Sequence, residues 1–428
     1  MPNAACGETY EATAHLPPPP SQSIGSMIRY LTAGESHGEA LIGVVEGVPA
    51  KLPLSADDIN EHLARRWLGY GRGGRSKIEN DKVHIYSGIR FSETLGSPIS
   101  FRIDNGAYKK DRAGWPEVMA VEGPPPEDLE RVTLPRPGHA DLAGMQKYEF
   151  DDIRPVIDRS SARETAMRVA CCSVARQLLN AFGMEVGSHV VRIGDVGYDA
   201  SEEWRERVNA LIREGGASAV YRAADESATR MLSEEMTERC VEHIEATKKA
   251  RDSLGGIYEV IVTGVPVGLG SYVQWDRRLD GKLVQAICSI QAQKAAEIGD
   301  GVRNAYRPGS KVHDPILPGE ERSVSRGGYA RRSNHAGGIE GGVSNGMPIT
   351  VRGYMKPIPT LIKPLDSVDT ATQEAQPTRY ERSDITSVPA ASTVAEATVA
   401  LVIANAFLEK YGGDSIPEIR RHMEADRA

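Results

Sequence analysis

The hydrophobic pattern near the start of the chain predicts two strands joined by a short polar turn. Residues 27–33 form the first apolar run, and residues 40–48 form a β-branched, glycine-broken run that Pro49 closes. Runs of this kind between turn residues are typical of strands. We therefore expect a β-hairpin whose turn carries the stretch "GESHG", residues 34–38.

The next element is predicted to be a helix that begins at Ser55. Ser55 can cap it, and Ile59, Leu63 and Arg66 follow at helical spacing, which places Arg66 on the apolar stripe. An arginine at the edge of such a stripe commonly snorkels to water. Here the helix runs into a glycine-rich loop that carries Arg72, so its end and the loop can also form a receptor for an anion.

A second clear helix is predicted for the segment "RSSARETAMRVACCSVARQLLNAFG", with Ser161 and Glu164 forming a capping box. Arg159 stands just before it. The free N–H groups of a helix start can bind an anion, although a simple cap needs no ligand, and on these residues alone the simple cap is favoured.

The remaining pattern predicts a mixture of helices and strands within one domain. We expect helical structure over 201–251, a strand in "IYEVIVTGVPVGLG", a helix over 279–296, a strand in "PITVRGYM" and a long buried helix from about Pro389. No repeat and no linker interrupts residues 27–428, which we interpret as a single α/β domain. The proline-rich residues 1–26 are predicted to be a disordered leader.

Composition excludes several classes of function. The chain has 428 residues and a formal charge of −8, which argues against a protein that coats nucleic acid. No apolar run reaches the length of a membrane span. The five cysteines lack metal-ligand spacing, so we expect no metal site and a reducing, cytoplasmic environment.

The "GESHG" turn also matches G-x-S-x-G, the motif that presents the nucleophile of α/β-hydrolases. That motif needs a strand-to-helix turn, whereas a strand follows here, so His37 is favoured over Ser36 as the functional residue. Other polar residues share a position in Gly- or Pro-rich turns, which indicates a site for a highly anionic small molecule with acid and base groups nearby. They are Arg66, Arg72, Arg136, His139, Arg159, Ser161, Lys356, Arg382 and Asp384.

Eight motifs in order resemble those of the chorismate synthase family, from about Met27 to about Asp414. They are "TAGESHG", "RRWLGYGRGGR", "LPRPGHADLAGMQKY", "DRSSARETAMRVA", "QAQKAAEIGDG", "NHAGGIEGGVSNG", "MKPIPT" and "RSDITSVPA". The resemblance implies an α+β fold, a β-α-β sandwich with helices packed between sheets. It also implies a homotetramer and a lyase that converts 5-enolpyruvylshikimate 3-phosphate to chorismate, using reduced FMN without net redox change.

The resemblance also implies roles for individual residues. His37 and His139 are expected to act as acids near the leaving phosphate and the flavin, and Asp384 to assist removal of the ring proton. Substrate is expected on Arg66, Arg72, Arg136, Arg159 and Arg382. FMN contacts are expected from Arg66, Arg72, Arg159, Ser160, Ser161, Gln291, Ala292, Gly341, Lys356, Pro357, Ile358, Pro359, Thr360 and Arg382.

Positions Arg66 and Arg72 also match those associated with a nicotinamide cofactor. No added reductase segment is visible, so NADPH or another external reductant is expected to supply the reduced flavin. Trp67 stands where the family frequently has arginine, and Gln293 where a hydrophobic residue is common. Because neither departure involves His37, His139 or Asp384, we expect these two residues to affect local packing only.

Overall fold

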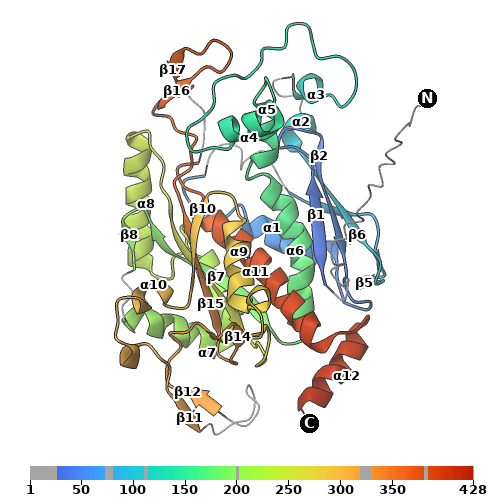
Figure 1. Cartoon of the computed structure of the whole chain (residues 1–428), viewed down its shortest axis with the longest axis vertical. Helices are drawn as coiled ribbons and strands as arrows, with labels where there is room; N and C mark the ends of the chain where they lie inside the picture. Colours follow the sequence, from blue (N-terminus) through green and yellow to red (C-terminus); the bar gives the residue numbers. More distant parts are fainter. Residues whose placement is uncertain are drawn as a thin grey trace, which may run out of the picture.

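Two antiparallel sheets enclose a layer of helices (Figure 1). The computed structural model describes residues 27–72, 81–109, 114–198, 202–318, 329–379 and 384–427. The four-stranded sheet has the order β1 (Arg29–Ala33), β2 (Ala40–Glu46), β6 (Ile99–Asp104), β3 (Val83–Ile85). The five-stranded sheet has the order β10 (Gln293–Ile298), β15 (Ile349–Met355), β9 (Gly256–Thr263), β7 (Glu185–Ile193), β8 (Val196–Gly197).

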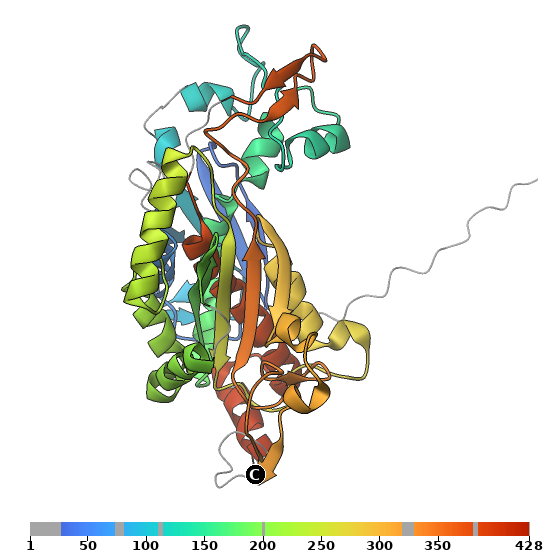
Figure 2. The same cartoon turned by 90° about the vertical axis from the view of Figure 1, so that its left-hand side faces the viewer.

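Helices cover both faces of the five-stranded sheet. The layer between the sheets holds α1 (Ala56–Arg65), α6 (Glu164–Ala181), α9 (Leu279–Cys288) and α11 (Val388–Tyr411). On the other face lie α7 (Glu202–Asp225) and α8 (Glu234–Lys249), as Figure 2 shows with the sheet seen nearly edge-on. This is the expected β-α-β sandwich, so the predicted α+β fold is confirmed.

Short elements decorate the two ends of the sandwich. At the upper end of Figure 1 lie α2 (Gly106–Lys109), α3 (Trp115–Val118), α4 (Asp141–Tyr148), α5 (Arg154–Ser160), β16 (Asp366–Val368) and β17 (Ala375–Pro377). The others are β4 (Ile89–Arg90), β5 (Glu93–Thr94), η3 (Trp275–Arg277), α10 (Gly301–Asn304), η4 (Gly309–Lys311), β11 (Ile316–Pro318), β12 (Tyr329–Arg331), β13 (Ile339–Glu340), β14 (Val343–Ser344) and α12 (Ile416–Arg427).

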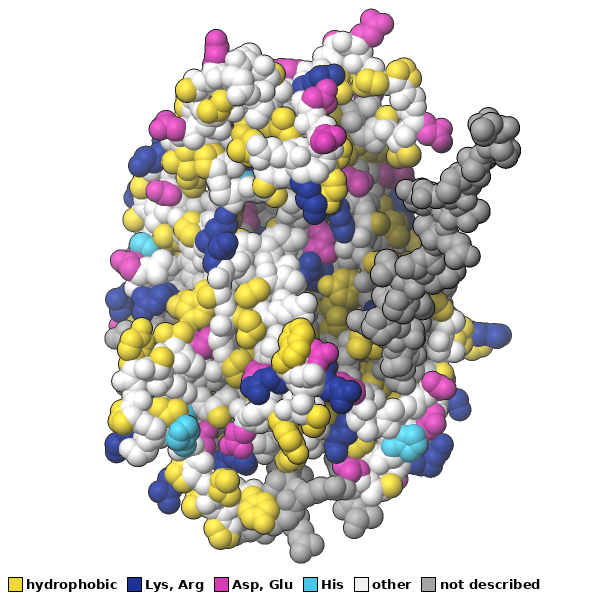
Figure 3. Space-filling model, viewed as in Figure 1, with side chains coloured by type: hydrophobic (Ala, Val, Ile, Leu, Met, Phe, Trp, Pro, Cys, Tyr) yellow, Lys and Arg dark blue, Asp and Glu magenta, His cyan; other side chains and the backbone are white. Residues whose placement is uncertain are grey.

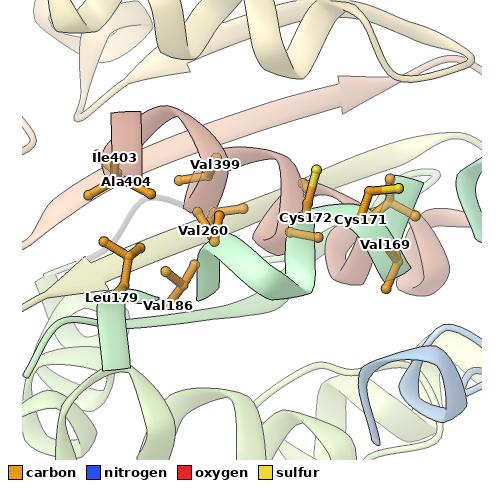
Figure 4. Packing of buried hydrophobic residues seen from close by; sticks show 14 of the residues in the cluster. Val169, Cys171, Cys172, Leu179, Val186, Val260, Val399, Ile403 and Ala404 are labelled. Carbon is orange, nitrogen blue, oxygen red and sulfur yellow. The ribbon is translucent and has the colours of Figure 1, made fainter. Parts of the chain in front are cut away.

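The core lies where α6 and α11 cross between the sheets. Small and β-branched side chains of the two helices pack against strands β7 and β9, as Figure 4 shows for Cys172, Val186, Val260 and Val399. Helix α11 is buried almost all round, as predicted from its Ala/Val-rich sequence. It is long and apolar enough to cross a membrane, but 83% of its most apolar window is buried, which is typical of a core helix.

A buried ion cluster joins the central helices to β7. Glu396 of α11 accepts hydrogen bonds from Arg65 at 2.6 Å, Arg176 at 2.6 Å and Arg230 at 3.2 Å. Asp225 pairs with Arg65 and Arg230. Burial alone would raise the pKa of Glu396, but the three guanidinium groups outweigh burial and lower this pKa well below its usual value.

Several local predictions are confirmed. Strands β1 and β2 pair as an antiparallel hairpin around the "GESHG" turn. Ser55 caps α1 through a capping box with Asp58. Strand β15 and the proline near the start of α11 also lie where the sequence predicts them. The predicted leader, residues 1–26, lies outside the described residues.

Two local predictions are wrong. The helix expected over 279–296 ends at Cys288, and Gln293–Ile298 is strand β10. Ala292, with φ of 65°, turns the chain, and pairing with β15 overrides the helical preference of the Ala- and Lys-rich segment. The Ser161–Glu164 capping box is also absent, because the Glu164 carboxylate instead binds Thr32, Gln291 and Arg168.

Candidate functional site

A cavity of about 170 Å³ opens between the C-terminal end of α1, the start of α6 and the start of α11. Its wall contains the guanidinium groups of Arg66, Arg72 and Arg163 and the carboxylate of Asp384. The rest of the wall is Trp67, Ser161, Ala162, Thr165, Ile290, Gln291, Met355, Ser387, Ala390, Ala391 and Val394. Positive charge therefore exceeds negative charge on the described wall.

Arg66 is buried and fixed rather than snorkelling. Its Nε donates to Thr165 Oγ1 at 3.0 Å, its Nη2 donates to the Ala162 carbonyl at 2.9 Å, and Nη1 lies 3.5 Å from Asp81. Arg66 directly follows the last residue of α1, and its side chain reaches the start of α6. The helix end predicted to receive an anion therefore lies in the cavity wall.

Asp384 belongs to the same wall and lies just before α11. Arg72 Nη1 is 2.9 Å from Asp384 Oδ2, and Ser387 Oγ donates to the same oxygen at 2.9 Å. The structure thus brings together three of the residues expected from sequence, Arg66, Arg72 and Asp384. Arg382 lies outside the described residues.

His37 lies in the β1–β2 turn and is not among the residues of the cavity wall. Its Nδ1 is 2.6 Å from Asp158 Oδ1, and the Trp115 ring stacks on it with centroids 4.0 Å apart. Ser36 is 2% exposed and donates its Oγ hydrogen to the same Asp158 oxygen, at 3.0 Å. A buried serine in a hairpin turn does not have the geometry of a nucleophile elbow.

His139 lies in a second turn, which Lys356 anchors by donating to the Gly138 carbonyl. Its Nδ1 donates to Asp141 at 2.5 Å, and Arg136 Nε donates to the other oxygen of this carboxylate at 2.8 Å. Burial alone would raise the pKa of Asp141, but hydrogen bonds from His139 and Arg136 lower it below its ordinary value. Arg136 is therefore engaged inside its own turn.

The remaining predicted contacts divide into two groups. Ser161 and Gln291 are in the wall, and Ala292 and residues 356–360 adjoin the wall residues Gln291 and Met355. Arg159 instead donates to the Thr32 and Gly34 carbonyls, and Ser160 donates to the Val156 carbonyl. Gly341 lies in the β13–β14 hairpin beside the start of β15, whereas the cavity lies at its end.

Sequence reasoning missed several residues of the site. Arg163 binds Asp81 at 2.5 Å and Asn105 at 3.0 Å, and Asn105 in turn donates to the Glu35 and Gly38 carbonyls of the His37 turn. Trp67 was expected to affect packing only, but it lines the cavity, with Arg66 and Arg72 over its ring. The one available signal was position, since Trp67 and Arg163 lie inside motifs already singled out.

The fold and the site define a class of protein: an α+β sandwich with a cavity whose described wall carries more positive than negative charge. Comparison with known proteins makes this specific. The sequence model of the chorismate synthase family matches residues 28–408. The chain is 80% identical to chorismate synthase of Salinibacter ruber over 403 residues, 94% of this chain and 99% of the relative.

More distant relatives agree. Chorismate synthase of Chlorobaculum tepidum is 51% identical, covering 94% of this chain and 98% of the relative, and that of Enterococcus faecalis is 50% identical with the same coverage. A crystal structure of chorismate synthase matches with a TM-score of 0.72 at 39% identity, over 94% of this chain and 98% of that one. The chain belongs to the chorismate synthase family, and its class is that of a carbon–oxygen lyase.

Proposed function

We propose that this chain converts 5-enolpyruvylshikimate 3-phosphate to chorismate and inorganic phosphate by an anti 1,4-elimination. The observation that carries the proposal is the cavity lined by Arg66, Arg72 and Arg163, with Asp384 in its wall. Family membership supports the reaction, and the geometry supports the division of tasks among the side chains.

The substrate carries two carboxylates and a phosphate, which need several cationic donors. Arg66 and Arg72 supply such donors from the wall, and Ser161 adds a hydroxyl group to the same wall. On the face drawn in Figure 3, basic side chains are interspersed with acidic ones, which supports a small anionic ligand over a nucleic acid.

The proposal assigns the proton transfers to two histidines and one aspartate. In each Asp–His pair the carboxylate accepts the Nδ1 hydrogen, so Nε2 is left for the ligand. His37 protonates the departing phosphate, and His139 holds a proton close to the flavin. Asp384, held by Arg72 and Ser387, takes part in removing the ring proton.

The cavity wall has the polar atoms that a flavin needs. Trp67 Nε1, Arg72 Nε and Gln291 Oε1 belong to wall residues and are buried without a hydrogen-bond partner. A flavin ring has both acceptors and a donor on its edge, so it can satisfy donors and an acceptor of this kind. Ser161, Gln291, Arg72 and residues 356–360 would hold FMN, which when reduced supplies electron density that helps phosphate leave. NADPH or another external reductant keeps it reduced.

Two further features of the assembly and its location belong to the proposal. The outer face of the four-stranded sheet exposes Leu31 at 77%, together with Ile42 and Val44, which supports self-association into the expected homotetramer. Cys171, Cys172 and Cys240 are buried free thiols, which supports a reducing cytoplasm. Light scattering on the purified chain tests the assembly, and a monomer at micromolar concentration would overturn the homotetramer.

The reaction is tested without oxygen, by measuring phosphate release and chorismate absorbance from 5-enolpyruvylshikimate 3-phosphate. FMN is supplied oxidised in one series and chemically reduced in the other. We expect turnover only with reduced FMN, with many product molecules per flavin. FMN binding without product in either series would contradict the proposed lyase activity.

A further inference from the structure

The buried carboxylate of Asp158 binds the turn that carries His37. The Asp158 side chain is 1% exposed and belongs to the short helix α5. Its Oδ1 lies 2.6 Å from His37 Nδ1 and 3.0 Å from Ser36 Oγ, and its backbone carbonyl accepts the Ser36 N–H at 3.2 Å. One residue thus contacts the turn through both its main chain and its side chain.

These contacts fix which ring nitrogen of His37 carries hydrogen. An ionised carboxylate can only accept hydrogen bonds, so Nδ1 must be the donor, and the neutral ring has its lone pair on Nε2. The stacked Trp115 ring, tilted by 17° from the imidazole plane, restricts rotation about the remaining axis. The His37 side chain keeps 24% of its surface exposed, so the ring is fixed yet open to a ligand.

We propose that Asp158 is the positioning residue of His37. It keeps hydrogen on Nδ1 and presents Nε2, which in the charged ring carries the proton that goes to the departing phosphate and leaves the neutral Nδ1–H form behind. The inference rests on the proposed function, in which His37 is the acid near the departing phosphate. A carboxylate that only clamped the hairpin would hold the backbone equally well but would leave the reaction indifferent to its charge.

Two substitutions separate these roles. Asp158→Ala removes the acceptor, whereas Asp158→Asn keeps an oxygen for His37 and Ser36 and loses only the charge. The new amide can occupy the place of Oδ2, which has no hydrogen-bond partner in the structure. Partners that orient a functional histidine typically contribute about 10–100-fold. We expect Asp158→Ala to lower kcat by roughly 30-fold and Asp158→Asn by roughly 10-fold, with KM within about 3-fold of wild type.

The chain offers a matched control in a second buried Asp–His pair. Asp300 Oδ2 lies 2.8 Å from His335 Nδ1, with side-chain exposures of 3% and 22%, close to those of the Asp158–His37 pair. Neither residue contributes to the described cavity wall. Asp300→Asn should therefore leave kcat within about 2-fold of wild type, although Asp300 also pairs with Arg205 and Arg352, so that its substitution disturbs more ion pairs than Asp158→Asn does.

The spectroscopic readout is the ¹⁵N spectrum of protein labelled at the histidine rings, recorded with magic-angle spinning. His37→Ala identifies the His37 signals. We expect wild type and Asp158→Asn to show the Nδ1–H form, and Asp158→Ala to show the Nε2–H form that free imidazole side chains favour. An unchanged His37 tautomer in a folded Asp158→Ala protein would overturn the inference. If that variant does not fold, wild-type kcat in Asp158→Asn overturns it instead.

A double-mutant cycle separates this inference from the proposed function. In a His37→Ala background, Asp158→Asn should cost less than about 2-fold in kcat, because its effect passes through His37. A full additional 10-fold loss would overturn the positioning role alone. Normal turnover in His37→Ala would remove the proposed role of His37. Absence of chorismate formation by wild type would reject the proposed function. In that case the tautomer measurement still tests the contact between Asp158 and His37.

Discussion

The Glu396 cluster gives a prediction whose size follows from its contacts. In Glu396→Gln, Asp225 still compensates Arg65 and Arg230, but Arg176 exchanges its carboxylate partner for neutral acceptors, the new amide oxygen and the Val186 carbonyl. One buried guanidinium therefore loses its counter-charge. Breaking a buried pair in this way costs about 3–5 kcal/mol. For 428 residues with an unfolding entropy of about 2.1 cal/mol/K per residue, the expected fall in Tm is roughly 3–6 °C.

The assay is urea unfolding followed by circular dichroism, with a Tm from calorimetry beside it. Glu409→Gln, on the same helix, is the control, because Glu409 pairs with Lys282 at 3.3 Å with its side chain 52% exposed, and we expect a change below about 0.5 kcal/mol. Adding Arg176→Met to Glu396→Gln should recover at least about 1 kcal/mol by removing the unpaired charge. A loss below about 1 kcal/mol in the single variant, or no recovery in the double, would refute the reasoning.

Further predictions concern the site, the pH dependence and the packing. His139→Ala should lower kcat by roughly 10²-fold in the phosphate-release assay, and turnover near wild type would remove its acid role. Trp67→Ala should raise the substrate KM about 5-fold because Arg66 and Arg72 lose the ring they stack on, while Trp67→Phe stays within about 2-fold. Burial would raise the pKa of Glu259, but Arg352 and His189 outweigh burial and lower this pKa to about 2. The ionised Glu259 therefore stabilises the fold fully above its unfolded pKa of 4.5, and this stabilisation is lost as the pH falls toward 2. Urea midpoints at pH 7, 4.5 and 3 should fall more steeply for wild type than for Glu259→Gln. Gly43→Ala should lower the free energy of unfolding by about 1–3 kcal/mol, because the new Cβ would lie 2.5 Å from the Met167 sulfur. Gly281→Ala is the control and should not destabilise the fold, because its Cβ would meet nothing within 4 Å. Equal urea midpoints for these two variants would contradict the packing argument.

Local sequence patterns predicted the elements whose stability is local. The β1–β2 hairpin, the Ser55 cap and the all-round apolar helix α11 each follow from residues within one segment. The errors arose where a distant partner decides the conformation. Strand β10 forms because β15 pairs with it, and Glu164 leaves the cap because it binds Thr32 and Gln291. Neither partner is visible in the local pattern.

The same division explains the site. The motifs identified Arg66 and His37, but the contacts that connect these two residues run through other residues, which the motifs did not indicate as functional. Arg66 lies against Asp81, Asp81 binds Arg163, Arg163 binds Asn105, and Asn105 donates to two carbonyls of the turn that carries His37. Apart from the half-buried contact between Asn105 and the Glu35 carbonyl, these links are buried, so a partner left unpaired by a substitution would cost more than the bond itself contributes. The position of His37 relative to Arg66 is therefore set by a chain of polar contacts that only the folded structure assembles. A substitution at Asn105 should therefore lower turnover, because it displaces His37, and should also weaken ligand binding, because it displaces Arg66.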